Sequence, residues 1–392
     1  MAMPFARRSF LAGALALPAV RLARAQTVRT IRQVAHENGF RFGSAVDSPI
    51  EIPRLRQLYE QECDLITPEN VMKMCTTQPR LDEEDFAPFL DLIAWAHASD
   101  ADVRGHPLIH ATSDKPPWIC TLAARDPAAA RAAMLYRVRR LARRFGRLVV
   151  SFDVVNEPIA VWPSDDEPLR DDWLFEGDGI GFIVEAFQIA REEAGEGVEL
   201  VLNEWILPYD VYMHPARRSA CLKMLKRCLD RGAPIDTLGI QSHLVPRNVT
   251  RIDHQDGTVE FRPQLRTFDH DEWRCFLDEV EKLGLRIAIT ELSAPDLFLD
   301  GPLELRNRIA AGDVEDYLNV TLQSRCIRDI VCWGLSDADT HYTNEAKLWE
   351  DAEEQTGRTI QSVSALPFDD DFAMKPMAEA IMRAMRNAPP RL

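Results

Sequence analysis

The sequence predicts a single α/β domain over residues 26–392, a (β/α)₈ TIM barrel in which eight parallel strands alternate with helices. Eight short apolar runs are separated by longer segments whose apolar residues recur every three or four positions, a helical spacing. Nearly every run is continuous, which is typical of parallel strands buried on both faces. No glycine-rich loop follows the first run, which disfavours the rival architecture, a doubly wound open sheet with a nucleotide site.

The apolar runs place eight strands along the chain. The expected strands are residues 40–45, 64–67, 102–109, 148–155, 199–203, 237–241, 286–290 and 330–335. The clearest helical segments between them are residues 128–145, 181–194, 217–231 and 270–283. A single barrel reaches the length of this chain when its loops carry insertions.

Residues 1–25 have the pattern of an export signal. Arg7 and Arg8 precede a short apolar stretch, and the small-residue sequence Ala-Arg-Ala at 23–25 closes it, as in a signal peptide. The arginine pair favours a twin-arginine signal, and an ordinary leader with two adjacent arginines is the alternative. We therefore expect a mature chain that begins near Gln26 and is periplasmic or secreted.

Charge and composition narrow the class of partner. The formal net charge is −16, and removal of residues 1–25, which carry four arginines and no acid, leaves −20. Such an acidic chain disfavours nucleic acid and anionic lipid and fits a neutral ligand. The eight cysteines form no Cys-x-x-Cys or Cys/His cluster and no cofactor motif is present, so we expect no metal and no organic cofactor. Separately, we expect a monomer.

Polar residues gather where the expected strands end. In an α/β barrel the C-terminal ends of the strands form the rim that carries the chemistry. One carboxylate there could be a helix cap, but so many polar groups on one rim indicate a site. The residues are Glu69-Asn70, Gly105-His106, Asn156-Glu157, Asn203-Glu204, Gln241-Ser242-His243, Glu291, Trp333 and Asp337.

Two of these carboxylates, Glu157 and Glu291, end the fourth and seventh expected strands. Hydrolysis of a glycosidic bond needs one carboxylic acid to protonate the leaving oxygen and a second carboxylate at the anomeric carbon. At a separation of ~5–5.5 Å the second carboxylate attacks directly and the configuration is retained. Strands four and seven face each other across the barrel, so these two side chains are expected to span one sugar ring.

Seven segments occur in the order found in one known family. Residues 152–158 read Phe-Asp-Val-Val-Asn-Glu-Pro, and residues 289–292 read Ile-Thr-Glu-Leu. The other segments are residues 69–73, 103–106, 238–244, 333–337 and the ending 368–378. Together they resemble the endo-1,4-β-xylanases, glycoside hydrolase family 10, over essentially the whole mature chain. The resemblance implies an enzyme with Glu157 as the acid/base and Glu291 as the nucleophile.

The resemblance also implies roles for residues beside the two carboxylates. Asn156 would hydrogen-bond the 2-hydroxyl of the sugar under attack, a contact that strengthens in the transition state. Gln241 and His243 would orient the nucleophile. The charge of Glu291 and partial burial should raise the pKa of Glu157 above that of Glu291.

Further residues are expected to bind the sugar on the non-reducing side of the cut. Alone, each would more often be a cap, a surface charge or a structural residue, but the two carboxylate motifs reverse that interpretation. These residues are Glu69, Asn70, Lys73 and His106, with Trp333 as an apolar platform under the ring. For residues 203–205, a place on the leaving-group side and a structural role remain open.

Three departures from the family pattern remove aromatic side chains from the expected cleft. Residues 107–110 lack a tryptophan and are one residue short. Residues 339–342 read Asp-Thr-His-Tyr where the family has a Ser-Trp pair, and Met74 replaces another tryptophan. The cleft therefore loses aromatic lining around the cut and the sugars before it.

A fourth departure concerns the nucleophile. Ser293 stands where the family commonly has an aspartate that supports the histidine of the sixth strand. A serine can still hydrogen-bond His243 but cannot stabilise it as a cation. We therefore expect a more often neutral His243 and a displaced pH optimum.

Three functions remain open. The first is an exported retaining endo-β-1,4-xylanase. The second is a retaining β-glycosidase of the same fold that acts on another or a decorated β-linked polysaccharide, and the third is a binding protein that has lost catalysis. An aromatic shelf before the cut, supplied by Trp118 or Tyr342, would favour an unbranched chain, whereas an open polar pocket would favour the second function.

Overall fold

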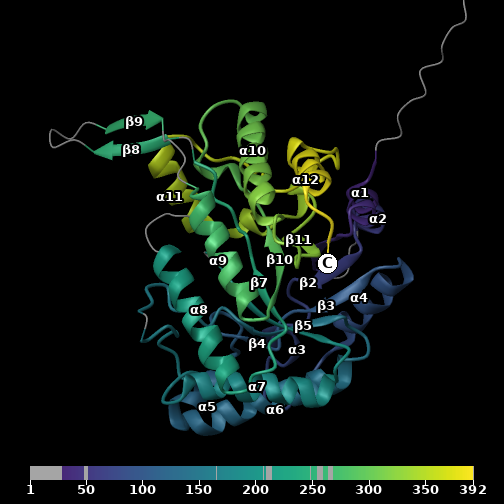
Figure 1. Cartoon of the computed structure of the whole chain (residues 1–392), viewed down its shortest axis with the longest axis vertical. Helices are drawn as coiled ribbons and strands as arrows, with labels where there is room; N and C mark the ends of the chain where they lie inside the picture. Colours follow the sequence, from purple (N-terminus) through teal and green to yellow (C-terminus); the bar gives the residue numbers. More distant parts are fainter. Residues whose placement is uncertain are drawn as a thin grey trace, which may run out of the picture.

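Eight parallel strands form a closed barrel in a computed structural model of the chain, among the residues that the structure describes (Figure 1). The described residues are 29–47, 52–164, 166–205, 207–208, 214–247, 249–253, 259–263 and 268–391. The barrel strands, in order, are β1 (Arg41–Val46), β2 (Leu65–Pro68), β3 (Asp102–Gly105), β5 (Ser151–Asn156), β6 (Glu199–Glu204), β7 (Thr237–Ile240), β10 (Arg286–Leu292) and β11 (Asp329–Cys332). β1 pairs with β11 and β3 pairs with β5, which closes the ring.

The closed ring confirms the predicted fold class and excludes the open sheet. Each predicted strand overlaps an observed one, with ends that differ by a few residues. The third strand is shorter than predicted, because the chain leaves the sheet at Gly105 and pairs again only as β4 (Ile109–His110), beside β5. Pro107, which has no backbone N–H to donate to a ladder, lies in this interruption.

The helices lie around the outside of the strands (Figure 1). Their bounds are α1 (Ile31–Glu37), α2 (Pro53–Glu62), α3 (Met74–Thr77), α4 (Ala87–Ala98), α5 (Pro117–Arg125), α6 (Pro127–Phe145), α7 (Gly179–Ala194), α8 (His214–Asp230), α9 (His270–Lys282), α10 (Leu303–Thr321), α11 (Ala346–Thr356) and α12 (Pro376–Asn387). The 3-10 turns are η1 (Asp296–Phe298), η2 (Asp337–Asp339) and η3 (His341–Asn344). A hairpin of β8 (Val249–Asp253) and β9 (Val259–Pro263), which the sequence did not predict, projects from the barrel.

Local sequence explains where the longer helices begin. The side chain of Asp126 accepts a hydrogen bond from the backbone N–H of Ala129, and Pro127 follows as the first residue of α6. Asp178 caps α7 in the same way through Gly181, and Asp269 caps α9.

Two apolar clusters support the barrel. The main cluster fills the barrel and the space between the strands and the helices. A second, smaller cluster joins η1, η3 and α11 with the chain that follows them. Its members are Leu297, Phe298, Tyr342, Ala352, Ile360, Val363, Ala365 and Leu366. This smaller cluster forms one wall of the cavity described below.

The strands that carry the two predicted carboxylates are irregular near their C-terminal ends. The register between β5 and β6 shifts between Asp153 and Val155, and the register between β10 and β11 shifts between Ile289 and Leu292. Glu157, just beyond β5, has a φ of 58°, in the left-handed region that side chains rarely adopt. Bulges and strained backbone of this kind re-aim side chains at functional sites.

The predicted export signal, residues 1–25, lies outside the described residues. Among the helices that the structure describes, none combines the length and the apolar character that a membrane crossing requires.

Candidate active site

A cavity of about 610 Å³ opens at the C-terminal ends of the strands. Eight of the ten residues predicted from the sequence line it, and the other two, Glu69 and Asn70, lie beside one of its walls. The eight are Lys73, His106, Asn156, Glu157, Gln241, His243, Glu291 and Trp333. The sequence therefore located the cavity and most of its polar wall.

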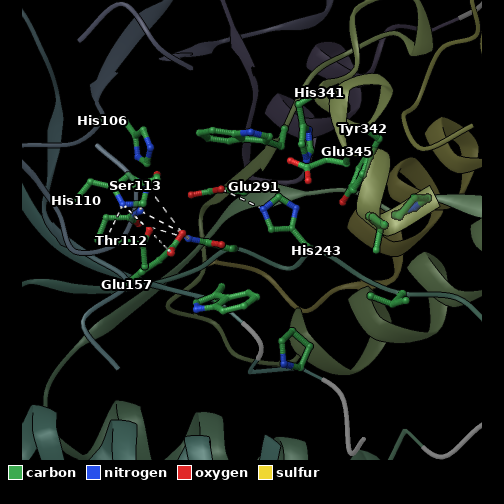
Figure 2. A pocket seen from close by; sticks show the side chains of 18 of the residues that line it. His106, His110, Thr112, Ser113, Glu157, His243, Glu291, His341, Tyr342 and Glu345 are labelled. Atoms are coloured by element: carbon green, nitrogen blue, oxygen red, sulfur yellow. Dashed lines mark hydrogen bonds and ion pairs between the residues drawn. The ribbon is translucent and has the colours of Figure 1, made fainter. Parts of the chain in front are cut away.

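Glu157 is held on one side of this cavity by three hydrogen-bond donors (Figure 2). Gln241 Nε2 donates to its Oε1 at 3.0 Å, Thr112 Oγ1 donates to its Oε2 at 3.1 Å, and Asn156 Nδ2 lies 3.4 Å from Oε1. Its main-chain carbonyl accepts a hydrogen bond of 2.6 Å from Arg170 Nε. These contacts fix a residue whose backbone is itself strained.

One guanidinium and one imidazole approach the same carboxylate. His110 Nε2 lies 4.0 Å from Glu157 Oε1, and Arg170 Nη2 lies 3.8 Å from Oε2. Burial raises the pKa of Glu157, but His110, the hydrogen bond from Gln241 and the charge of Arg170 outweigh burial and hold the pKa below its ordinary value. The predicted elevation of this pKa is therefore wrong for the protein without substrate.

His110 itself responds to burial. Burial lowers its pKa to about 4, and the negative charge of Glu157 only partly opposes this. The imidazole is therefore neutral near pH 7, and its Nδ1 lies 3.0 Å from Thr112 Oγ1. Neither His110 nor Thr112 was among the predicted site residues.

Glu291 lies across the cavity beside Asn203 and His243 (Figure 2). Asn203 Nδ2 donates to its Oε1 at 2.7 Å, and His243 Nε2 lies 3.1 Å from its Oε2. Ser293 Oγ lies 2.8 Å from the other nitrogen of that imidazole, Nδ1, which confirms the predicted contact between Ser293 and His243.

Asn203 connects the two sides of the site. Besides Glu291, its Nδ2 contacts Asn156 Oδ1 at 2.8 Å, and its own Oδ1 accepts a hydrogen bond of 2.7 Å from Thr290. Gln241 contacts both Asn156, at 3.4 Å, and Glu157. The residues around the two carboxylates therefore form one continuous hydrogen-bond network.

The three residues of segment 203–205, whose roles the sequence left open, differ in their contacts. Asn203 reaches Glu291, and Trp205 lines the cavity. Glu204 is fully buried and pairs with Arg217 at 2.7 Å, while it also accepts hydrogen bonds from backbone N–H groups. Burial raises the pKa of Glu204 to about 7 despite this pairing. Glu204 is thus a structural carboxylate.

One wall of the cavity is backed by a group of polar and charged side chains: Asp47, Glu69, Asn70 and Lys73. Lys73 Nζ donates to Asn70 Oδ1 at 2.9 Å, and Asn70 Nδ2 donates to Asp47 Oδ2 at 2.7 Å. Burial and the charge of Asp47 raise the pKa of Glu69 to about 7, and Lys73 opposes them. Asn70 therefore supports Lys73, which alone of the three lines the cavity.

His106 is fixed from behind by a buried ion pair. Its Nδ1 lies 2.8 Å from Asp153 Oδ2, and Arg104 donates to Asp153 Oδ1 at 2.6 Å. The ring packs edge-on against Trp333, with 5.1 Å between the centroids. Asp153, which lies on β5 four residues before Glu157, was not predicted as part of the site.

The cavity continues beside residues 341 and 342, where the family has a Ser-Trp pair, into a part lined by both apolar and charged side chains. His341 and Tyr342 lie there, together with Val245, Arg247, Pro295, Phe298, Glu345 and Leu348. Burial lowers the pKa of His341 to about 3. Trp118, one of the two side chains considered as a replacement shelf, instead donates its ring N–H to Gln78 O and does not line this cavity. Tyr342 does line it, but as a buried side chain.

A closed barrel with a carboxylate on each side of a rim cavity, each aligned by amides, is the arrangement of a glycoside hydrolase. Comparison with known proteins specifies the family. A sequence model of glycosyl hydrolase family 10 matches residues 30–384, and the chain belongs to this family.

Characterised relatives are distant in sequence. The chain is 27% identical over 316 residues to endo-1,4-beta-xylanase A of Caldicellulosiruptor saccharolyticus, covering 79% of this chain and 86% of that protein. It is 25% identical over 343 residues to endo-1,4-beta-xylanase 2 of Aureobasidium pullulans, covering 87% of this chain and 84% of the relative. The chain is accordingly an endo-1,4-β-xylanase-like glycoside hydrolase.

Solved structures share the fold. Native xylanase 10B from Thermotoga maritima superposes with a TM-score of 0.74 at 22% identity, covering 91% of this chain and 98% of that one. Xylanase 10B from Thermotoga petrophila, solved in complex with xylobiose, gives a TM-score of 0.73 at 22% identity, covering 91% and 97%.

Proposed function

We propose that this enzyme hydrolyses internal β-1,4-xylosidic bonds of xylan with retention of configuration. The observation that carries the proposal is the pairing of Glu157 and Glu291 across one cavity, within one network of amide hydrogen bonds. The xylanase relatives support xylan as the polymer.

The first step would form a glycosyl–enzyme ester. Glu157 gives its proton to the glycosidic oxygen, the bond from that oxygen to the anomeric carbon breaks, and a carboxylate oxygen of Glu291 bonds to the anomeric carbon. Asn156 would bind the 2-hydroxyl of the same sugar. In the second step Glu157 takes a proton from water, the water oxygen bonds to the anomeric carbon, and Glu291 leaves.

The proton on Glu157 needs an explanation, because its neighbours lower its pKa in the empty site. Burial is the largest single influence on that pKa and acts to raise it. A sugar in the cavity displaces water and strengthens this influence. We infer that substrate binding itself favours the protonated acid.

The two ends of the cavity would bind different parts of the chain. Lys73 and His106 would hold hydroxyls before the cut, with Trp333 under the ring, and Asn70 would hold Lys73 in place. Trp205 would contact the leaving sugar. Axial C–H bonds of a pyranose pack on aromatic faces, which suits both tryptophans.

Export belongs to the same proposal. Residues 1–25 would direct the chain out of the cytoplasm through their arginine pair, which suits an enzyme whose polymeric substrate lies outside the cell. Expression of the full chain in a bacterial host, with Arg7 and Arg8 each replaced by Lys in a second version, tests this. Protein that stays in the cytoplasm in both versions would remove the export proposal.

The experiment for the reaction measures new reducing ends from purified protein and linear xylan, with Glu291→Ala as the control. We expect release that the control abolishes, and proton NMR of the first product should show the β-anomer. An initial α-anomer would contradict retention, and no release from any xylan would remove xylan as the substrate.

A decorated β-linked polysaccharide is the second candidate, and the charged side chains beside His341 in the cavity lining, Arg247 and Glu345, favour it. This part of the cavity also includes Phe298 and Leu348. A substituent on the sugar chain could enter there. Faster release from glucuronate- or arabinose-decorated xylan than from linear xylan at equal chain concentration would support this substrate; equal or slower release would exclude it.

A further inference from the structure

Two positions at which this chain departs from its family, 293 and 342, are in direct contact. The hydroxyl of Tyr342 lies 2.8 Å from Ser293 Oγ, and Ser293 Oγ lies 2.8 Å from His243 Nδ1. The other imidazole nitrogen lies 3.1 Å from Glu291 Oε2. Four side chains therefore form one continuous row that ends on the nucleophile proposed above.

The charge of Glu291 determines the direction of each hydrogen bond in this row. A carboxylate only accepts, so His243 Nε2 must donate, and a neutral imidazole then has only a lone pair at Nδ1. Ser293 must donate a hydrogen bond to that lone pair. Its oxygen then accepts a hydrogen bond from the hydroxyl of Tyr342.

The reverse direction is unfavourable. If His243 carried its proton on Nδ1, it would donate to Ser293, and the lone pair of Nε2 would face Glu291 Oε2 at 3.1 Å. Two acceptors at that distance repel each other, and the nucleophile would lose one of its hydrogen bonds.

We propose that Tyr342, acting through Ser293, is a positioning residue that holds His243 as the neutral Nε2–H tautomer facing Glu291. The proposal rests on the proposed function only for the role of Glu291. An aspartate at 293 would instead favour the doubly protonated, cationic ring. Ser293 and Tyr342 thus act together: their hydrogen bonds to His243 replace the ion pair that an aspartate at position 293 would form. We call the row from Tyr342 to His243 the relay.

The two residues of η3 near His243, His341 and Tyr342, are uncharged near pH 7. The ring of His341 lies 5.9 Å from that of His243, and burial is the main cause that lowers the pKa of His341 to about 3. Burial raises the pKa of Tyr342 well above its ordinary value, and its hydrogen bond with Ser293 only partly opposes this.

Among the contacts described for the His243 ring, Glu291 is the carboxylate within hydrogen-bond distance. Trp333 packs edge-on against the ring, with 6.4 Å between the centroids. Glu291 faces Nε2, and the charged side chains of Glu345 and Lys73 line the same cavity with opposite signs. Among the contacts that the structure describes for Nδ1, Ser293 Oγ is the partner and no carboxylate reaches it.

The test in activity is a double-mutant cycle. Tyr342→Phe removes the first donor and should lower kcat/KM ~10-fold, the value of about one hydrogen bond. In Ser293→Asp the new carboxylate supports the His243 ring without help from Tyr342. Tyr342→Phe in that background should therefore lower kcat/KM by less than ~3-fold. Ser293→Asp should also move the acidic limb of the pH profile to lower pH, since a cationic His243 lowers the pKa of Glu291.

Tyr317→Phe is the matched control. Tyr317 is also buried, and its hydroxyl lies 2.7 Å from the hydroxyl of Ser242, the residue before His243. The substitution removes the same kind of hydrogen bond without touching the ring. It should lower the melting temperature as much as Tyr342→Phe does and leave the pH profile unchanged.

A second measurement is independent of turnover. ¹⁵N NMR of the imidazole rings, with His243 assigned by the signal lost in His243→Asn, reports the tautomer directly. We expect Nε2–H in the parent and in Tyr317→Phe, and a mixture of tautomers in Tyr342→Phe. An unchanged tautomer in Tyr342→Phe, or additive effects in the cycle, would overturn the relay. An inactive parent with the expected spectra would instead remove only the proposed function.

Discussion

The two carboxylates of the site are stabilised in opposite ways. Glu157 is surrounded by groups that carry or can carry positive charge, His110 and Arg170, and its backbone has a positive φ. Glu291 lies near the irregular end of β10 and receives hydrogen bonds from Asn203 and from His243, for which we propose the neutral tautomer. The difference matches what the proposed reaction asks of each residue.

An acid/base must change its charge twice in each cycle, whereas a nucleophile must start as an anion. Neutral donors hold the anion of Glu291 in position without an ion pair that would have to break when the ester forms. The positive charge of Arg170 near Glu157 stabilises the carboxylate that must accept a proton from water in the second step. Because the pKa of His110 is lowered to about 4, this neighbour is neutral whenever Glu157 is protonated near pH 7.

The largest effect is expected at the nucleophile. Glu291→Ala should lower turnover of every substrate by ~10⁴-fold or more, because no covalent intermediate can form. The measurement is the initial rate on xylan and on an activated aryl β-xyloside. A residual rate within ~100-fold of the parent on either substrate would contradict the assignment.

The acid/base should behave differently with the two substrates. Glu157→Gln should lower the rate on xylan by ~10²–10⁴-fold, while an aryl leaving group that departs without a proton should still form the ester rapidly. A burst of phenol followed by slow turnover is the expected signature. Equal losses on both substrates would show that Glu157 does not protonate the leaving group.

A third carboxylate on the rim sharpens the comparison, because it is structural. Arg217→Met leaves Glu204 buried without its partner and should destabilise the fold by ~3–5 kcal/mol, measured by denaturant unfolding. Adding Glu204→Gln should recover part of this loss. An unfolding free energy that stays within ~1 kcal/mol of the parent would contradict a structural role for the pair.

The smallest expected effect is a shift of the pH profile when the positive charge of Arg170 is removed. Arg170→Gln removes a positive charge 3.8 Å from Glu157, so the pKa of this carboxyl should rise. The basic limb of the kcat profile should move up by ~1 pH unit, since the acid stays protonated to higher pH. The control is Arg131→Gln, whose side chain donates to the Trp173 and Glu176 carbonyls; an identical shift there would contradict the local explanation.

Much of the site was predictable because barrel strands are short, apolar and end at one rim. The motifs at Glu157 and Glu291 could be placed at the ends of the fourth and seventh strands, which the structure places in those positions. The supporting residues were less visible. Asp153 reads as one more residue of a buried strand, and only its contacts with Arg104 and His106, far apart in the chain, mark it as part of the site.

Other features depend on distances that no local pattern encodes. Arg170 reaches Glu157 across a loop, and Thr112 reaches it from the segment after β4. Ser293 and Tyr342 could each be recognised as departures, but their contact became visible only in three dimensions. The lowered pKa of Glu157 also required the positions of its neighbours, since burial alone favours the opposite direction.

The left-handed backbone of Glu157 has a consequence for how this lineage can lose its activity. A residue with a side chain in that conformation costs ~1–2 kcal/mol, which glycine avoids and asparagine reduces. Replacement of Glu157 by glycine would therefore tend to relieve backbone strain while it ends catalysis. A single substitution of Glu157 could thus stabilise the fold and leave a protein that binds sugar without cleaving it. Selection for turnover opposes that substitution.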